Sequence, residues 1–201
     1  MSLDALSSFM PVGALNYLSV WGSAFPIHIK VTRPRHSKLG DYRKLKNGKH
    51  QITINGNLSP FLFFFVLTHE MAHLIAFEKY QRISPHGKEW KQTFGQLLLE
   101  SLEVYPQDLQ EILKSFAKNP KASFNADVSL ARYFKAPPSH QSLIEDLELG
   151  DVFYYRSQEY QIHEKRKKRY LCIHLGTGRQ YLFSPTAEVQ PLKLLNNEHE
   201  K

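Results

Sequence analysis

The sequence predicts an α+β protein in which helices accompany a small three-stranded sheet and a smaller β subdomain follows. Three observations lead to this class. Short stretches between residues 27 and 55 alternate apolar and polar side chains, as strands do. A long apolar stretch at 60–80 is typical of a buried helix, and residues 150–190 alternate strand-forming residues with turn signals.

The N-terminal elements follow from local patterns. Apolar residues at helical spacing over 3–20 predict a helix, with Pro11 opening its main part. Asn47-Gly48 favours a tight hairpin turn between two strands. Three strands are therefore expected, at 27–32, 38–46 and 51–55.

Three helices are predicted next. Residues 60–80 are apolar around much of the helical circumference, so we expect this helix to be central and buried. Further helices are predicted over 88–103 and 106–117. The longest apolar run, 60–67, is shorter than the roughly 20 residues that cross a membrane, so no membrane partner is expected.

The chain is predicted to have three parts. Residues 1–118 form the core domain, 119–149 a linker or irregular packing segment, and 150–195 the small β subdomain. The linker is indicated by clustered turn formers, among them Pro120, Pro137 and Pro138. The last residues, 196–201, are expected to fray.

Composition narrows the class of protein. The 201 residues are 42% hydrophobic and 22% charged, as in folded globular proteins. The single cysteine, Cys172, excludes a disulfide scaffold and a four-cysteine zinc site, and the N-terminus lacks the basic start of a secretory signal. We therefore expect a cytoplasmic protein, and no heptad pattern or long apolar strip indicates anything but a monomer.

A metal-binding pattern lies within the predicted central helix, at His69-Glu70-Met71-Ala72-His73. Residues four apart on a helix point the same way, so His69 and His73 can hold one zinc ion through their ring nitrogens. Glu70, beside them, can take a proton from a water that attacks a carbonyl group. The alternative is an ordinary solvated helix edge, but an apolar helix gives little reason for these residues without a metal.

A catalytic zinc ion usually has three protein ligands and one open position. His86 is the preferred third ligand, because a Pro-His-Gly turn before the next helix can bring it back to the same ion. A glutamate from that helix, Glu100 or Glu103, is the competing choice.

Four stretches together resemble the SprT-like metalloprotease family, which includes the Spartan-type proteases that digest proteins crosslinked to DNA. They are Arg35-His36-Ser37-Lys38-Leu39-Gly40-Asp41-Tyr42, Ile52-Thr53-Ile54-Asn55, His69-Glu70-Met71-Ala72-His73 and His86-Gly87-Lys88-Glu89-Trp90. The resemblance covers roughly residues 10–110. It implies a zincin-like metalloprotease core with one zinc ion on His69, His73 and His86, and Glu70 as the general base. It also implies that the strand at 51–55 lines the cleft and pairs with an extended peptide substrate.

The C-terminal segment is similar to the zinc ribbon that follows the protease core in many members of the family. A zinc ribbon needs four cysteines, and this chain has only Cys172. We therefore expect a metal-free hairpin or small sheet. Four aromatic side chains are expected to hold it: Phe153, Tyr155, Tyr170 and Tyr181.

The charge distribution suggests a nucleic-acid partner. The chain carries 26 Lys and Arg against 19 Asp and Glu, a net charge of +7. Residues 28–50 are strongly basic, and five consecutive basic residues are predicted to bind DNA without sequence preference. These are Lys165, Arg166, Lys167, Lys168 and Arg169. The alternative is a solvated hairpin tip whose lysines suppress aggregation.

The predicted function is therefore a zinc-dependent metallopeptidase acting on a protein or peptide substrate, including DNA-associated or DNA-crosslinked proteins. Two alternatives stay open. One is a nucleic-acid-binding or regulatory module that keeps a zinc site without proteolysis. The other is a zinc hydrolase of a non-peptide substrate.

Overall fold

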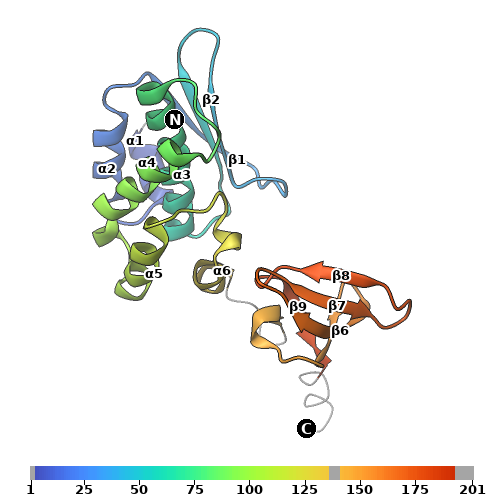
Figure 1. Ribbon diagram of the computed structural model, residues 1–201. Helices are drawn as coiled ribbons and strands as arrows, with labels where there is room; N and C mark the ends of the chain where they lie inside the picture. The colour runs from blue at the N-terminus through green and yellow to red at the C-terminus, as the bar shows by residue number, and fades with distance from the viewer. Residues whose placement is uncertain (1–2, 136–140, 193–201) are drawn as a thin grey trace. The chain divides into compact units, whose positions relative to one another are not determined.

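The computed structural model describes residues 3–135 and 141–192 (Figure 1). The chain divides into two compact units, Met1–Ala122 and Ser123–Lys201. The first combines helices with a three-stranded sheet, and the second is built mainly on a six-stranded sheet. The predicted α+β class with a small three-stranded sheet is confirmed. The predictions for Pro137, Pro138 and residues 196–201 lie outside the described residues.

The N-terminal helix is broken. The structure has a short α1, Leu3–Leu6, a 3-10 turn η1, Ser7–Phe9, and a longer α2, Ala14–Gly22. The sequence predicts one stretch in which Pro11 opens the main helix. Instead α2 begins at Ala14, because Gly13 before it adopts φ 86°, a left-handed conformation that glycine tolerates and a helix cannot continue.

The first unit's sheet has the order β1-β3-β2. Strand β3, His50–Asn55, lies between β1, Ile27–Thr32, which is parallel to it, and β2, Gly40–Lys44, which is antiparallel. Because both edges of β3 are occupied, the expected pairing of the 51–55 strand with a peptide is wrong. Among the described residues, β2 pairs with β3 alone, so its other edge is free.

The two faces of this sheet differ in character. The inner face carries Ile29, Ile52 and Ile54, which are almost fully buried. Helix α3, Pro60–Tyr80, packs against β2 and β3. Alternation along the strands places polar residues such as Lys30 and Arg43 on the opposite face.

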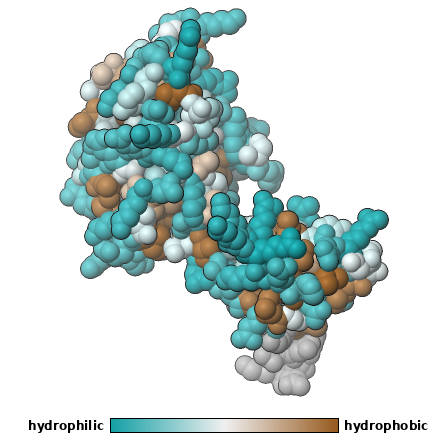
Figure 2. All heavy atoms as spheres, in the orientation of Figure 1, coloured by the Kyte–Doolittle hydropathy of each residue, from teal (hydrophilic) through white to brown (hydrophobic). Residues whose placement is uncertain are grey.

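Helix α3 is the centre of the first unit. It begins at Pro60, which suits the first helical position because it has no N–H to leave unpaired. Its length and composition would allow it to cross a membrane, but 67% of its most apolar window is buried inside the protein. The face of the molecule in Figure 2 is mainly hydrophilic and shows no broad apolar band. These features identify α3 as a core helix.

Two further helices complete the first unit. Helix α4, Lys88–Glu100, packs against α3 and against α5, Gln107–Ala117, and a short 3-10 turn η2, Leu102–Val104, joins α4 to α5. Phe65 of α3 lies with its ring centroid 5.4 Å from that of Phe94 and 5.7 Å from that of Phe116. This aromatic cluster fixes α4 over α3, and so fixes the residues at the start of α4.

The C-terminal unit is an antiparallel sheet of order β4-β9-β5-β6-β7-β8. Its strands are β4 Ser142–Leu143, β5 Val152–Tyr155, β6 Gln158–Lys165, β7 Tyr170–His174, β8 Gln180–Phe183 and β9 Glu188–Pro191. Phe153, Tyr170 and Cys172 belong to its buried core, and Tyr155 packs against that core. Tyr181, which we expected to hold the sheet, is 41% exposed.

The segment predicted as a linker, 119–149, contains folded structure. It holds a 3-10 turn η3, Phe124–Ala126, helix α6, Val128–Lys135, strand β4 and a 3-10 turn η4, Ile144–Asp146. Everything from Ser123 onward belongs to the C-terminal unit. The turn-forming residues of this segment favour a linker, but the segment also contains short apolar groups. Two of these apolar residues, Leu143 and Ile144, are fully buried.

Candidate metal centre

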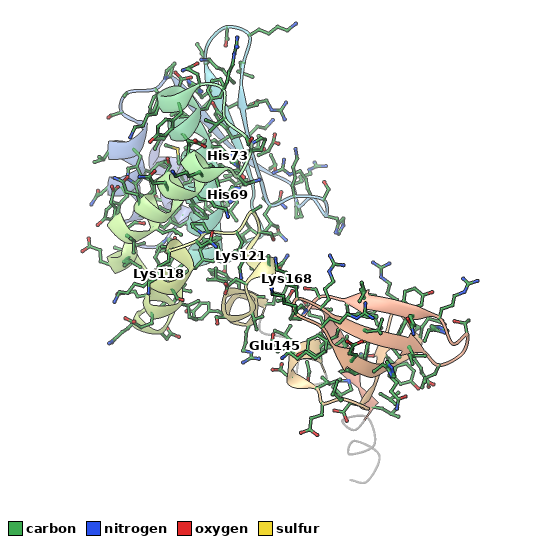
Figure 3. The ribbon with its side chains drawn as sticks, in the orientation of Figure 1. His69, His73, Lys118, Lys121, Glu145 and Lys168 are labelled. Atoms are coloured by element: carbon green, nitrogen blue, oxygen red, sulfur yellow. The ribbon has the colours of Figure 1, made fainter. Side chains whose placement is uncertain are left out.

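Two candidate ligands come from one face of α3. His69 and His73 lie one turn apart on this helix, as their labels in Figure 3 show. Their neighbours along the helix, such as Leu67 and Leu74, are fully buried, which fixes the rotation of α3 about its axis. The two imidazoles are therefore held toward the same point.

The third imidazole comes from the turn before α4. The N–H of Gly87 donates to the carbonyl of Ser84 at 3.0 Å, with Pro85 and His86 between them. His86 has φ 57°, which is the backbone conformation that the third position of a type II turn requires and that glycine adopts most easily. A non-glycine residue in this conformation has a backbone strain of about 1–3 kcal/mol. Placing an imidazole here therefore lowers the stability of the fold.

The three imidazoles meet at their Nε2 atoms. Nε2 of His73 lies 3.1 Å from Nε2 of His69 and 3.1 Å from Nε2 of His86, and the third separation is 3.2 Å. A ring nitrogen either donates or accepts, so three mutual hydrogen bonds cannot form among these atoms. A cation that accepts all three lone pairs would satisfy them, and adjacent ligands of tetrahedral zinc are about 3.3 Å apart. His69, His73 and His86 could therefore hold a metal ion.

Burial keeps these imidazoles in the neutral form that binds metals. Desolvation lowers the pKa of His69 to about 3, and the nearby His73 and His86 add to the effect. It lowers the pKa of His73 to about 4 and also lowers that of His86. At neutral pH their ring nitrogens are therefore available as ligands.

The indole of Trp90 supports all three imidazoles. Its ring centroid lies 4.7 Å from that of His69, 5.2 Å from that of His73 and 4.5 Å from that of His86. Trp90 is fully buried and lies in the first turn of α4, four residues after His86. In the sequence, Trp90 closes the stretch His86 to Trp90 that resembles the SprT-like family, but no local pattern assigns it this supporting role.

Glu70 is a buried carboxylate beside the cluster, with 6% of its surface exposed. Desolvation raises its pKa to about 8, and the charge of Asp41 adds to this. The backbone N–H of Tyr42 donates to the carboxylate and opposes the shift, as do the charges of Lys38 and Arg35. A cation on the imidazoles would further favour the ionised carboxylate.

The free edge of β2 faces this carboxylate. The N–H of Asn55 donates to the carbonyl of Leu39, and that of Leu45 donates to the carbonyl of Lys49. Because hydrogen-bonded pairs alternate along an antiparallel ladder, Gly40, Tyr42 and Lys44 turn their backbone groups away from β3. The bond from Tyr42 to Glu70 agrees with this alternation. The aromatic ring of Tyr42 lies nearly parallel to that of His73, at 6.5 Å between centroids.

A sequence model described as the SprT-like family matches residues 17–106. This stretch of the chain is similar to that family. It contains the three-stranded sheet, α3, the turn with His86 and α4, and so every residue of the metal centre described above.

Curated relatives match shorter parts of the chain. Protein SprT of Glaesserella parasuis is 40% identical over 40 residues, which are 20% of this chain and 26% of the relative. Protein SprT of Yersinia pestis is 43% identical over 42 residues, 21% of this chain and 24% of the relative. Protein SprT of Actinobacillus succinogenes is 39% identical over 54 residues, 26% of this chain and 32% of the relative. The chain thus spans about a quarter to a third of these relatives, and no solved structure matches it.

The competing ligands are used elsewhere in the SprT-like stretch. Glu100 accepts hydrogen bonds from Trp21 and Gln96. Glu103 accepts one from Tyr17 at 2.8 Å. Both carboxylates thus tie the α4 region to its neighbours, and neither belongs to the cluster.

The five basic residues lie in the C-terminal unit, outside the SprT-like match. Residues 165–169 span the end of β6 and the turn into β7, and all five are exposed. The turn is closed by the N–H of Arg166 donating to the carbonyl of Arg169 at 2.8 Å. Lys165 lies over the ring of Tyr170, and Arg166 is 3.3 Å from Glu164. Lys168, labelled in Figure 3, belongs to this turn.

Proposed function

We propose that this chain is a zinc-dependent metallopeptidase with a zincin-like core. One observation carries the proposal: Glu70, a buried carboxylate, directly follows a ligand of the three-imidazole cluster and contacts the free edge of β2. A metal site that only stabilises a fold has no use for such a carboxylate. The SprT-like match over residues 17–106 supports the same activity.

The donor set fits zinc, with His69, His73 and His86 as its ligands. When bound there, zinc would act as a Lewis acid that makes water more acidic and polarises a carbonyl group. Glu70 is the general base. Its carboxylate accepts the proton of the attacking water and returns it to the nitrogen of the leaving amine.

The substrate is an extended peptide that lies along β2. Gly40 and Lys44 direct backbone donors and acceptors outward on this edge, and an added strand can pair with them. The N–H of Tyr42 between them is already donated to Glu70. Such pairing reads the backbone of the substrate and not its side chains. The peptidase is therefore expected to accept many unfolded sequences.

We further propose that the substrates include proteins associated with DNA or crosslinked to it. Each unit has a basic surface that supports this. The outer face of the first sheet carries Lys30 and Arg43, and the second unit carries the turn at 165–169. No base-reading motif accompanies them, so DNA binding is expected to be independent of sequence. The resemblance to Spartan-type proteases points the same way, and the protein would act as a cytoplasmic monomer.

The test is degradation of a basic DNA-binding protein by the zinc-loaded chain, with and without single-stranded DNA. The Glu70→Gln variant is the inactive partner, and Glu111→Gln, at an exposed carboxylate of α5, is the matched control. Cleavage by wild type and Glu111→Gln, but not by Glu70→Gln, would support the peptidase. Turnover by Glu70→Gln would refute the role of Glu70. No cleavage by wild type holding one zinc ion would favour a regulatory module or a non-peptide hydrolase.

A further inference from the structure

The connection between β1 and β2, residues 33–39, passes over the end of the central strand β3. The two strands flank β3 on opposite sides, so the connection must cross the end of β3 at Asn55. Most of its side chains are basic or polar, so apolar packing contributes little to holding it. Hydrogen bonds must do this instead.

Asn55 is the anchor of this crossing. Its side chain is buried, with 1% of the residue exposed. Its Nδ2 donates to the carbonyl of Arg35 at 3.0 Å and to that of Lys38 at 3.1 Å. Its Oδ1 accepts from Nε of Arg35 at 2.8 Å, and its backbone N–H donates to the carbonyl of Leu39 at 2.9 Å. One buried side chain thus holds the connection at several points.

Arg35 closes the same network from the other side. Beyond its bond to Asn55, its Nη1 donates to Oγ1 of Thr53 at 3.0 Å. Its Nη2 lies 3.4 Å from the carbonyl of Thr53 and 3.5 Å from that of Leu39. The planar guanidinium thereby joins the connection to two residues of β3, in a pattern that a lysine ammonium cannot reproduce.

This network sits directly before the contact between β2 and Glu70. Leu39, held by Asn55, is the residue before Gly40, and a Cβ atom at Gly40 would approach Glu70 within 2.6 Å. Two residues further on, the N–H of Tyr42 donates to the Glu70 carboxylate. The position of Leu39 therefore sets where the free edge of β2 lies relative to Glu70.

We propose that Arg35 and Asn55 are positioning residues that hold the start of β2 against Glu70, so that the general base and the peptide-binding edge keep a working geometry. This inference rests on the proposed peptidase function. Neither residue belongs to the imidazole cluster, so metal binding does not require them. A small displacement of a reacting group can lower turnover by about a hundredfold. Loss of this network is therefore expected to lower the turnover rate.

The experiment compares Arg35→Gln, Arg35→Lys and Asn55→Asp with wild type. Asn55→Asp keeps the shape and the acceptor for Arg35 but removes both Nδ2 donors. Lys46→Gln is the control, since Lys46 is exposed in the turn that follows the opposite end of β2. For each variant we measure bound zinc, backbone hydrogen exchange of residues 38–45, and kcat and KM on an unfolded protein substrate.

All variants are expected to bind one zinc ion. Exchange over 38–45 should be about tenfold faster in the Arg35 and Asn55 variants, and kcat about tenfold to a hundredfold lower. Arg35→Lys should not restore kcat although it restores the charge, and Lys46→Gln should match wild type. Loss of zinc in step with kcat, or wild-type exchange and kcat in Arg35→Lys, would overturn the inference.

The outcomes separate the two proposals. If wild type has no turnover, the proposed function fails, while exchange over 38–45 at constant zinc content still decides whether Arg35 and Asn55 hold β2. If wild type is active and exchange is unchanged in every variant, the peptidase stands and the positioning role is refuted.

Discussion

Gly40 lies against Glu70 so closely that a Cβ atom built on it would stand 2.6 Å from Oε1 of the carboxylate and 2.7 Å from Cγ1 of Val66. Strand β2 and helix α3 therefore meet at a residue without a side chain. The absence of a methyl group is what allows the free edge of β2 to approach the candidate metal centre.

The first prediction concerns this contact. Gly40→Ala should bind metal like wild type but turn over at least about tenfold more slowly, because its methyl group must displace Glu70 or β2. Steady-state kinetics and metal analysis on the same sample test it. Gly22→Ala is the control, since its Cβ atom would lie 3.7 Å from Ile27, an ordinary contact. Equal turnover in Gly40→Ala and Gly22→Ala would contradict the prediction.

The second prediction concerns the third ligand. His86→Ala should weaken zinc binding by at least about a hundredfold, because it leaves two imidazoles on α3. Competition with a coloured chelator measures the affinity. His28→Ala, at an exposed histidine of β1, should bind zinc as wild type does. Unchanged affinity in His86→Ala would remove His86 from the ligand set.

The third prediction concerns the backbone at the same residue. With φ at 57°, His86 occupies a conformation that glycine adopts without strain. Without metal, His86→Gly should therefore be more stable than His86→Ala by about 1–2 kcal/mol. Urea unfolding of both metal-free variants gives the difference, and a less stable glycine variant would show that the turn is not strained.

The fourth prediction concerns the packing of α4 against the end of α5. A Cβ atom at Gly95 would stand 2.4 Å from the backbone oxygen of Ala117. Alanine favours a helix by about 1 kcal/mol over glycine, but overpacking costs about 1–3 kcal/mol and here meets backbone, which cannot turn aside. Gly95→Ala should therefore lower the free energy of unfolding. A more stable variant would mean that the two helices separate without cost.

The fifth prediction concerns the basic turn of the C-terminal unit. Replacing Lys167 and Lys168 by glutamine should weaken binding of single-stranded DNA. The slope of log affinity against log salt should fall by about 0.7 for each phosphate that the turn ceases to neutralise. The fold should persist, because backbone groups of Arg166 and Arg169 close the turn. Lys114→Gln, at a lysine paired with Glu111, is the control. An unchanged salt slope would rule out phosphate binding by this turn.

The side chains of the candidate metal centre are the part that local sequence patterns predict most directly. The spacing of His69 and His73 on a helix determines their direction, and the Pro-His-Gly turn offered His86. The structure brings these three side chains together. The surroundings were harder, since the contacts of Trp90 and Gly40 depend on how α4 and β2 pack on α3, which no local pattern encodes.

The sheet shows a second limit. Alternation predicted three strands near their observed bounds, but it gives no neighbour order. The hairpin at Asn47-Gly48 explains why β2 pairs with β3; nothing local shows that β1 takes the other side of β3. That order decides which strands have a free edge. The segment 119–149 shows a related limit. Its prolines and polar residues favour a linker, because its short apolar groups become buried only once the sheet has assembled.

The open edge of β2 also bears on self-association of the protein. An unpaired strand edge is a template on which a second copy of the same chain can add, and this is a common start of aggregation. Lys38, Arg43 and Lys44 lie on or beside this strand. Asp41 pairs with the first two and Glu78 of α3 with the third, so these cations outnumber the carboxylates paired with them. Two such edges brought together would oppose like charges, whereas a neutral or acidic peptide meets no such barrier. Under the proposed function, the strand would pair with foreign chains and repel its own copy, a discrimination that should weaken as salt screens the charges.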